Sequence, residues 1–166
     1  REKLVLANET ATLCPSSFAQ LTISEYLASQ PFLEQVEVYR GVYRARRDAL
    51  LEAMAAYLPA GTSWTVPAGG FYSWVTLPAG LDAAAMLPRA VAALVAYVPG
   101  SGFYADGQGQ RSLRLSYCYP DPDRIREGVR RLAGVVEAEL ELADTFGSTL
   151  TDLPPLRPAS PSPDLA

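Results

Sequence analysis

The clearest β-strand of the sequence is Ser112-Leu113-Arg114-Leu115-Ser116-Tyr117-Cys118-Tyr119, residues 112–119. Its leucines alternate with polar residues, and this period of two is typical of a strand with one buried face. Leu113 and Leu115 should therefore lie on the buried face. Arg114 should point from the opposite face, either towards an anion or towards solvent.

Three shorter segments upstream also have the composition of strands. They are residues 63–66, 71–77 and 96–99, and the first two are rich in aromatic and β-branched residues. Turn-forming sequences containing Pro and Gly follow the first two segments. A loop rich in Gly, Ser and Asp, residues 100–110, joins the third to the strand at 112–119.

Helical periodicity occupies most of the first 58 residues. Residues 1–14 have helical spacing, and Ser16 or Ser17 is placed to cap a second helix that runs to about Ser29. Pro31 then opens an amphipathic helix of roughly seven turns, at ~3.6 residues each. The sequence Pro59-Ala60-Gly61 should end this helix.

Two further helices are predicted in the second half of the chain. Asp82 should cap an alanine-rich helix that runs to about Leu94, and Pro88 should kink or split it because proline removes an amide donor. The last helix should begin with Asp121 as N-cap and Pro122 in its first position. Its predicted buried stripe is Ile125, Val129, Leu132, Val136 and Leu140.

The order of these elements predicts an α+β fold. We expect a small, mainly antiparallel sheet with helices on one face. From about Thr145 the sequence loses its periodicity and becomes rich in Pro and Ser, so residues 145–166 are expected to form a disordered tail.

The composition excludes several classes of function. The chain has no histidine and a net charge of -4, which removes the commonest catalytic base and makes a nucleic-acid partner a poor fit. Its two cysteines, Cys14 and Cys118, are far apart in sequence and fit two reduced, buried thiols in a cytoplasmic protein better than a disulfide or a metal site. No run of about 18 apolar residues is present to predict a membrane span.

Three motifs together resemble the class I and II aminotransferases of fold type I, which use pyridoxal phosphate (PLP). They are Pro67-Ala68-Gly69-Gly70-Phe71-Tyr72-Ser73-Trp74, Val98-Pro99-Gly100-Ser101-Gly102-Phe103 and Leu113-Arg114-Leu115-Ser116-Tyr117. Their order and spacing, and the Arg/Glu-rich helix after them, also fit. The resemblance covers roughly residues 1–142 and is closest to the 2-aminoadipate subgroup. It implies the C-terminal small domain of such an enzyme.

The resemblance assigns candidate roles to four residues. Arg114 would bind the α-carboxylate of the substrate, because a guanidinium can hold both carboxylate oxygens in a planar fork. The alternative for Arg114 is a surface salt bridge. Gly69 and Gly70 would bring the backbone close to the substrate pocket, or they form only a turn between two strands. Ser101 would line the small-domain side of the cleft, or it ends a strand.

The aromatic and charged residues near these motifs have simpler interpretations. Trp64, Tyr72 and Trp74 are expected to be core aromatics. The arginines and Glu127 of the last helix are expected to form a solvated face.

The family's Schiff-base lysine has no counterpart in this chain. Lys3 is the one lysine, and its context Arg1-Glu2-Lys3-Leu4 is not the SxSK-like motif of the family. We therefore expect no catalytic, cofactor-binding or metal-binding residue here, and PLP only in the complete enzyme. Residues 1–30 would be a remnant of the large-domain or interdomain helices, residues 31–144 the small domain, and residues 145–166 the tail.

Three functions fit this resemblance. The first is the C-terminal part of an aminotransferase of amino-acid metabolism, inactive alone. The complete enzyme would be a cytoplasmic homodimer, without a membrane or nucleic-acid partner, that moves an amino group between an amino acid and a 2-oxo acid. The second is a non-catalytic aminotransferase-like module. The third is the effector domain of a winged-helix transcriptional regulator.

Overall fold

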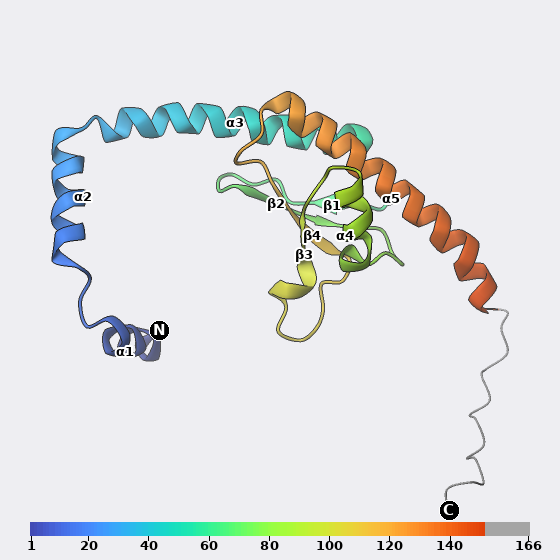
Figure 1. Cartoon of the computed structure of the whole chain (residues 1–166), viewed down its shortest axis with the longest axis horizontal. Coiled ribbons are helices and arrows are strands. Elements are labelled where there is room, and N and C mark those ends of the chain that lie inside the picture. The colour runs from blue at the N-terminus through green and yellow to red at the C-terminus, as the bar shows by residue number, and fades with distance from the viewer. Residues whose placement is uncertain (152–166) are drawn as a thin grey trace, which may run out of the picture. The chain divides into compact units, whose positions relative to one another are not determined.

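The computed structural model describes residues 1–151, with side chains through Phe146, as two compact units (Figure 1). The first unit, Arg1–Val42, contains α1 (Glu2–Thr12), α2 (Ser17–Ser29) and the beginning of α3 (Phe32–Tyr57). Ser16 caps α2 as predicted, because its hydroxyl accepts a hydrogen bond from the amide of Ala19. Helices α1 and α2 contain no buried residue.

The second unit begins at Tyr43 and contains a four-stranded antiparallel sheet. Its strands are β1 (Ser63–Trp64), β2 (Tyr72–Thr76), β3 (Val98–Pro99) and β4 (Ser112–Ser116). They lie in the order β1-β2-β4-β3, so β2 and β4 form the centre of the sheet. The predicted antiparallel sheet is confirmed.

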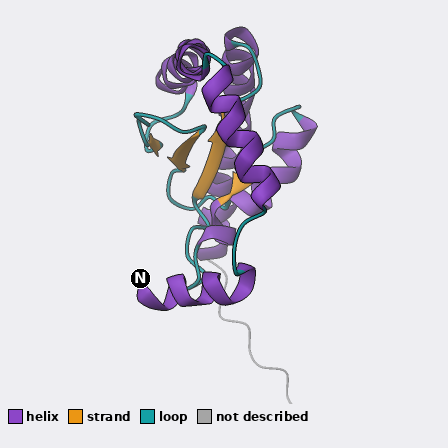
Figure 2. Cartoon of the chain, turned by 90° about the vertical axis from the view of Figure 1, so that its left-hand side faces the viewer, coloured by secondary structure: helices purple, strands orange, loops and turns teal. Residues whose placement is uncertain are grey.

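Three helices pack on one face of this sheet (Figures 1 and 2). They are the C-terminal part of α3, α4 (Ala83–Ala92) and α5 (Pro122–Thr151). The buried residues that join them to the sheet are Ala49, Leu50, Ala53 and Met54 of α3, Ala83, Met86 and Ala90 of α4, Ile125, Val129, Leu132 and Val136 of α5, and Val75, Leu113 and Leu115 of the strands. The predicted stripe of α5 is thus confirmed, with Leu140 partly buried.

The predicted N-caps of α4 and α5 are also confirmed. The carboxylate of Asp82 accepts hydrogen bonds from the amides of Ala84 and Ala85, at 2.7 and 3.0 Å. The carboxylate of Asp121 does the same for the first amides of α5. Both caps satisfy amide groups that have no partner within their helix.

Two predictions about helices are wrong. Pro88 was predicted to kink or split α4, and the split is wrong because α4 continues through Pro88 to Ala92, whereas the kink stays a prediction. Pro88 and Ala84 are both exposed, so the carbonyl group of Ala84 that loses its amide partner can be hydrated. Helix α5 continues to Thr151, so the tail does not begin at Thr145. The remainder of the expected tail, residues 152–166, lies outside the described residues.

Candidate functional site

The face of the sheet opposite the helices carries Arg114. Alternation along β2 and β4 puts Tyr72, Trp74 and Arg114 on this side, because Val75 and Leu113 point into the core. Arg114 lies at the centre of the sheet, paired with Trp74 on β2 and with Val98 on β3. We call the side chains of Tyr72, Trp74, Val98 and Arg114 the open face. Tyr72 is 44% exposed, whereas Val75 and Leu113 are completely buried.

Two aromatic rings contact the guanidinium of Arg114. Its Cζ atom lies 4.0 Å from the centroid of the Tyr72 ring and 5.0 Å from that of Phe103. Both distances are within the range of cation–π attraction. Phe103 comes from η1 (Gly100–Phe103), the 3-10 helix that follows β3. Its ring also meets Trp74 edge-on, at a centroid distance of 5.4 Å.

The guanidinium of Arg114 has no carboxylate or carbonyl partner among the described residues. Arg46, Arg47, Arg114 and Arg131 are the half-buried arginines there. Arg46 donates to the Cys118 carbonyl, Arg47 to Asp48, and Arg131 to Glu127. No such contact is present for Arg114. A partly desolvated cation without an anion is costly, so this arrangement favours binding of an external anion.

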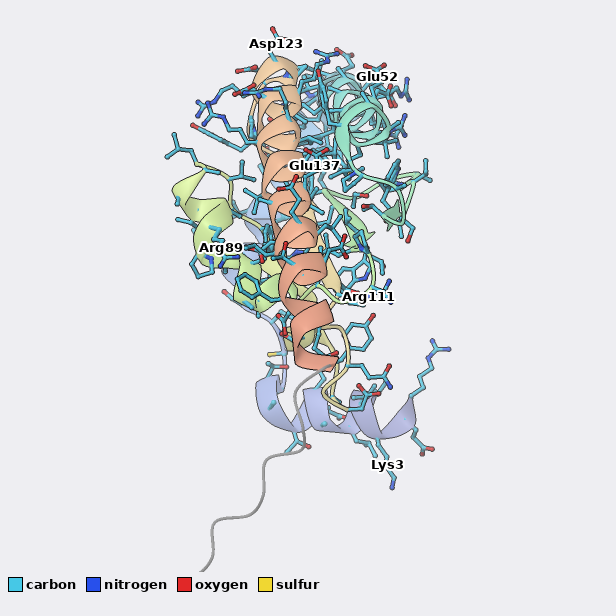
Figure 3. All side chains as sticks on the ribbon, turned by 90° about the vertical axis from the view of Figure 1, so that its right-hand side faces the viewer. Lys3, Glu52, Arg89, Arg111, Asp123 and Glu137 are labelled. Atoms are coloured by element: carbon cyan, nitrogen blue, oxygen red, sulfur yellow. The ribbon has the colours of Figure 1, made fainter. Side chains whose placement is uncertain are left out.

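Arg111 differs from Arg114 although it lies only one residue before β4. Its Nε and Nη2 atoms donate to the carbonyl oxygen of Leu77 at 3.0 and 2.8 Å. Arg111 can be found by its label in Figure 3. Arg111 therefore ties β4 to the end of β2, whereas Arg114 keeps its donors available.

The glycine pair lies where the chain enters β2. Gly70 has a φ of +86°, a left-handed conformation that glycine adopts without strain. Its carbonyl oxygen accepts a hydrogen bond from the Tyr117 hydroxyl at 3.0 Å. A Cβ atom built on Gly69 or Gly70 would meet no atom of the chain within 4 Å. The left-handed backbone conformation accounts for a glycine at position 70. Crowding by other atoms of this chain does not account for a glycine at position 69 or 70.

Ser101 lies half-buried in η1, two residues before Phe103. Its neighbour Gly100 has a stricter role that the sequence did not reveal. A Cβ atom at Gly100 would come within 2.6 Å of Ser112 Cβ and 2.8 Å of the Ser112 carbonyl oxygen. Glycine at this position therefore allows η1 to pack directly on β4, and this packing places Phe103 near Arg114.

The two rings that contact Arg114 were not predicted from the sequence. Tyr72 is exposed, so the prediction that it is a core aromatic is wrong, and no role was predicted for Phe103. Alternation along residues 71–77 places Tyr72 and Trp74 on one face, which was an available signal for Tyr72. No local signal could place Phe103, because its contact with Arg114 depends on the course of the loop after β3.

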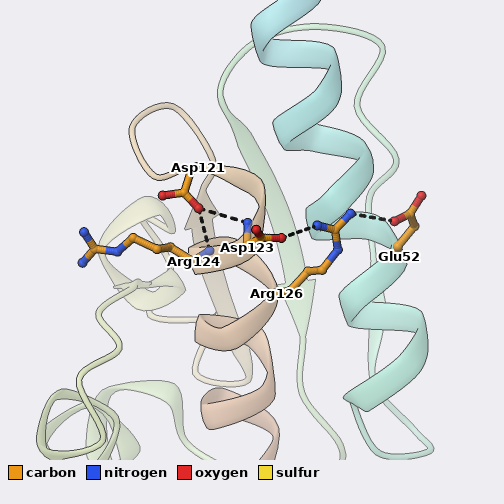
Figure 4. Close-up of polar contacts among 5 residues, drawn as sticks. All are labelled: Glu52, Asp121, Asp123, Arg124 and Arg126. Atoms are coloured by element: carbon orange, nitrogen blue, oxygen red, sulfur yellow. Dashed lines mark hydrogen bonds and ion pairs between the residues drawn. The ribbon is translucent and has the colours of Figure 1, made fainter.

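The charged residues of α5 form a solvated face, as predicted. Arg126 links Asp123 to Glu52 of α3 across two helices, at 3.0 and 3.4 Å (Figure 4). Hydrogen bonds from Arg130 and then Arg131 lower the pKa of Glu127 to about 2. These residues pair with one another on the helix surface and lie away from the open face.

Other possible sites do not involve Arg114. A groove of about 780 Å³ lies between α5 and residues 94–96, and Arg114 is not among its lining residues. Within the described residues, no group of three or more His, Cys, Asp or Glu side chains is placed to hold a metal ion. No helix in that part of the chain is long and apolar enough for a membrane span. Lys3 is exposed on α1 (Figure 3). The prediction of two buried thiols is wrong, because Cys14 is exposed and Cys118 is only half-buried.

Known proteins are similar to this chain in sequence and in fold. The sequence model for aminotransferase class I and II matches residues 3–132. The 2-aminoadipate transaminase of Thermus thermophilus is 40% identical over 141 residues, which are 85% of this chain and 35% of that protein. The structure of a multiple substrate aminotransferase from Thermococcus profundus is 39% identical, with a TM-score of 0.76 over 84% of this chain and 35% of the other.

A different kind of relative matches a shorter region. An uncharacterized HTH-type transcriptional regulator of Bacillus subtilis is 30% identical over 118 residues, 71% of this chain and 24% of that protein. The chain thus spans about a third or less of the length of these relatives. Most of the chain matches the family model, and the fold agrees with solved aminotransferases. The chain therefore belongs to the class I and II aminotransferase family.

Proposed function

We propose that this chain provides the substrate-carboxylate site of a PLP-dependent aminotransferase, and that Arg114 binds the carboxylate. The observation that carries the proposal is the half-buried guanidinium of Arg114, which has no anionic partner among the described residues and lies against the rings of Tyr72 and Phe103. Gly69, Gly70 and Ser101 are proposed to line the same pocket. Gly70 lies in the turn before Tyr72, and Ser101 lies in the 3-10 helix that ends at Phe103.

The role of Arg114 would be to bind and orient the substrate. Two parallel N–H donors match the two oxygens of a carboxylate, so both ends of that group are fixed. Every amino acid and every 2-oxo acid carries this carboxylate. One arginine can therefore serve both halves of an amino-group exchange, and it fixes the direction of the bond that must break at Cα.

The cofactor would be held outside this chain. PLP, when bound, draws electrons from the substrate Cα. The described residues do not fit an anchor for it, because Lys3 is exposed on α1 and lies outside a motif like that of the family. Every role proposed for this chain therefore concerns substrate binding. The complete enzyme is proposed to be a cytoplasmic homodimer that exchanges an amino group between an amino acid and a 2-oxo acid.

The regulator-like relative supports a second candidate, an amino-acid-binding effector domain of a helix-turn-helix regulator. In that case Arg114 would bind the carboxylate of an effector instead of a substrate. The reading frame upstream of Arg1 distinguishes the candidates. A lysine in an SxSK-like motif supports the enzyme, and a winged-helix segment supports the regulator.

The test of the proposed function is kinetic. The chain is joined to the portion of the Thermus thermophilus relative that lies outside the matched region, and Arg114→Lys and Arg114→Ala are compared with the parent. Hydrogen bonds to charged groups contribute about 1.5–3 kcal/mol each, so kcat/KM should fall roughly ten- to several-hundred-fold for every substrate. Arg124→Lys, at an exposed arginine of α5, is the control. Unchanged kcat/KM in both Arg114 variants would contradict the assignment.

A further inference from the structure

We infer that Tyr72 and Phe103 are positioning residues, whose rings hold the Arg114 guanidinium in the conformation that binds a carboxylate. This inference rests on the proposed function of Arg114. It concerns two aromatic side chains that lie partly in solvent, Tyr72 at 44% and Phe103 at 51% exposed. Both rings are partly open to solvent and at the same time lie within 5.0 Å of the Arg114 guanidinium carbon, measured from their centroids.

The rings supply the interaction that Arg114 lacks elsewhere. With no carboxylate or carbonyl within hydrogen-bonding distance among the described residues, the side chain would otherwise sample many rotamers. The ring of Tyr72, with the Arg114 Cζ atom 4.0 Å from its centroid, and the ring of Phe103, at 5.0 Å, attract the cation without occupying its N–H donors. A carboxylate partner within the chain would have held the guanidinium equally well but would compete with the substrate.

Rigid elements fix both rings. Tyr72 is the first residue of β2 and pairs with Ser116 of β4, two residues beyond Arg114. The ring of Phe103 packs edge-on against Trp74. In addition, η1 packs so closely on β4 that only glycine fits at position 100. The rings therefore restrict Arg114 before a ligand arrives. Ordering a long side chain in advance removes an entropy loss that binding would otherwise incur.

The first test examines Arg114 in the full 166-residue chain by NMR of its Nε–Hε group. Ring currents should shift the Arg114 Hε resonance upfield relative to the exposed Arg124. The shift should persist in Tyr72→Phe and largely disappear in Tyr72→Leu, with a smaller loss in Phe103→Leu, whose ring lies farther away. The Hε resonance of Arg111, bonded to Leu77, should not change. The amide spectrum shows whether each variant is folded.

The inference would be overturned if the Hε chemical shift of Arg114 equals that of Arg124 in the parent chain. It would also be overturned if the Arg114 shift does not change in Tyr72→Leu. Either result would mean that the rings merely cover the sheet. This experiment does not depend on catalysis, so it tests the positioning of Arg114 separately from its proposed role.

The second test uses the joined enzyme described above. Tyr72→Leu should raise KM about three- to thirty-fold for both the amino acid and the 2-oxo acid, with a smaller change in kcat. Tyr72→Phe should restore the parent KM, because it keeps the ring that contacts Arg114. If Arg114 variants lose activity while Tyr72→Leu and Phe103→Leu keep the parent KM, the positioning role fails and the proposed function stands. If Arg114 variants keep full activity, the proposed function itself fails.

Discussion

The two faces of the sheet serve different purposes. The helix-covered face is apolar and closed, and Val75 and Leu113 are fully buried there. The open face carries one cation, Arg114, and two aromatic residues, Tyr72 and Trp74, with Phe103 of η1 beside them, and no anion of the described residues pairs with Arg114. One face therefore holds the fold together, and the other is the face for which we propose ligand binding. Residues that neighbour each other along β4 can thus have unrelated roles, because successive side chains of a strand point to opposite faces.

The largest contrast should come from neighbouring positions on β4. Leu113→Ala creates a cavity in the closed core and should lower the free energy of unfolding by about 2–5 kcal/mol. Arg114→Ala should change it by less than about 1 kcal/mol, since Arg114 forms no ion pair with any described residue. Urea unfolding of the full chain, followed by circular dichroism, measures both. Equal losses of unfolding free energy in the two variants would contradict the view that only the helix-covered face stabilises the fold.

Gly100 lies where η1 packs on β4, and Gly100→Ala should have the next largest effect. The added methyl group would lie within 2.6 Å of Ser112 Cβ and must displace backbone, so a loss of about 1–3 kcal/mol in stability is expected. The Arg114 Hε resonance should also shift as Phe103 moves. Gly102→Ala is the matched control, because its methyl group would meet nothing within 4 Å. A stable Gly100→Ala protein with an unchanged Arg114 resonance would show that η1 does not depend on this contact.

Tyr97 is buried in the core, and removing its hydroxyl group should have a smaller effect on stability. Its buried hydroxyl donates to the carbonyl oxygen of Ala83 at 2.6 Å, and burial, followed by Glu139 and Asp82, raises its pKa. Tyr97→Phe should cost about 0.5–1.5 kcal/mol, the usual net value of one hydrogen bond. Tyr119→Phe is the control, at a side chain that is 84% exposed. Thermal unfolding of the two variants side by side would reveal the difference, and equal midpoints would count against the bond.

The smallest effect concerns the charged surface of α5 and depends on pH. Hydrogen bonds from Arg130 and Arg131 lower the pKa of Glu127 from 4.5 to about 2 in the folded protein. The stabilisation is therefore fully present above pH 4.5 and is lost as the pH falls through about 2. Glu127→Gln should make the urea midpoint less dependent on pH across this window. Glu137→Gln, on the same helix but outside these ion pairs, should leave the dependence unchanged. An identical dependence in both variants would show that the Glu127 pairs contribute nothing measurable.

Local chemistry made most of the secondary structure predictable. Asp82 and Asp121 cap their helices as expected, and the stripe from Ile125 to Val136 is buried, because capping and periodicity act within a few residues. The two wrong predictions also have local causes. Pro88 is tolerated because its lost hydrogen bond faces solvent, and the weak periodicity after Thr145 did not stop α5.

The sequence alone determined the alternation along β4, and with it the separation of Arg114 from the leucines beside it. It also determined the family motifs and the presence of a single lysine, Lys3. Tertiary structure decided which arginines are paired: Arg111 bonds to Leu77, whereas Arg114 contacts two rings from elements that precede it. No local pattern encodes that difference. It depends on strand order, register and the close packing of η1 at Gly100, which bring together residues that are distant in the chain.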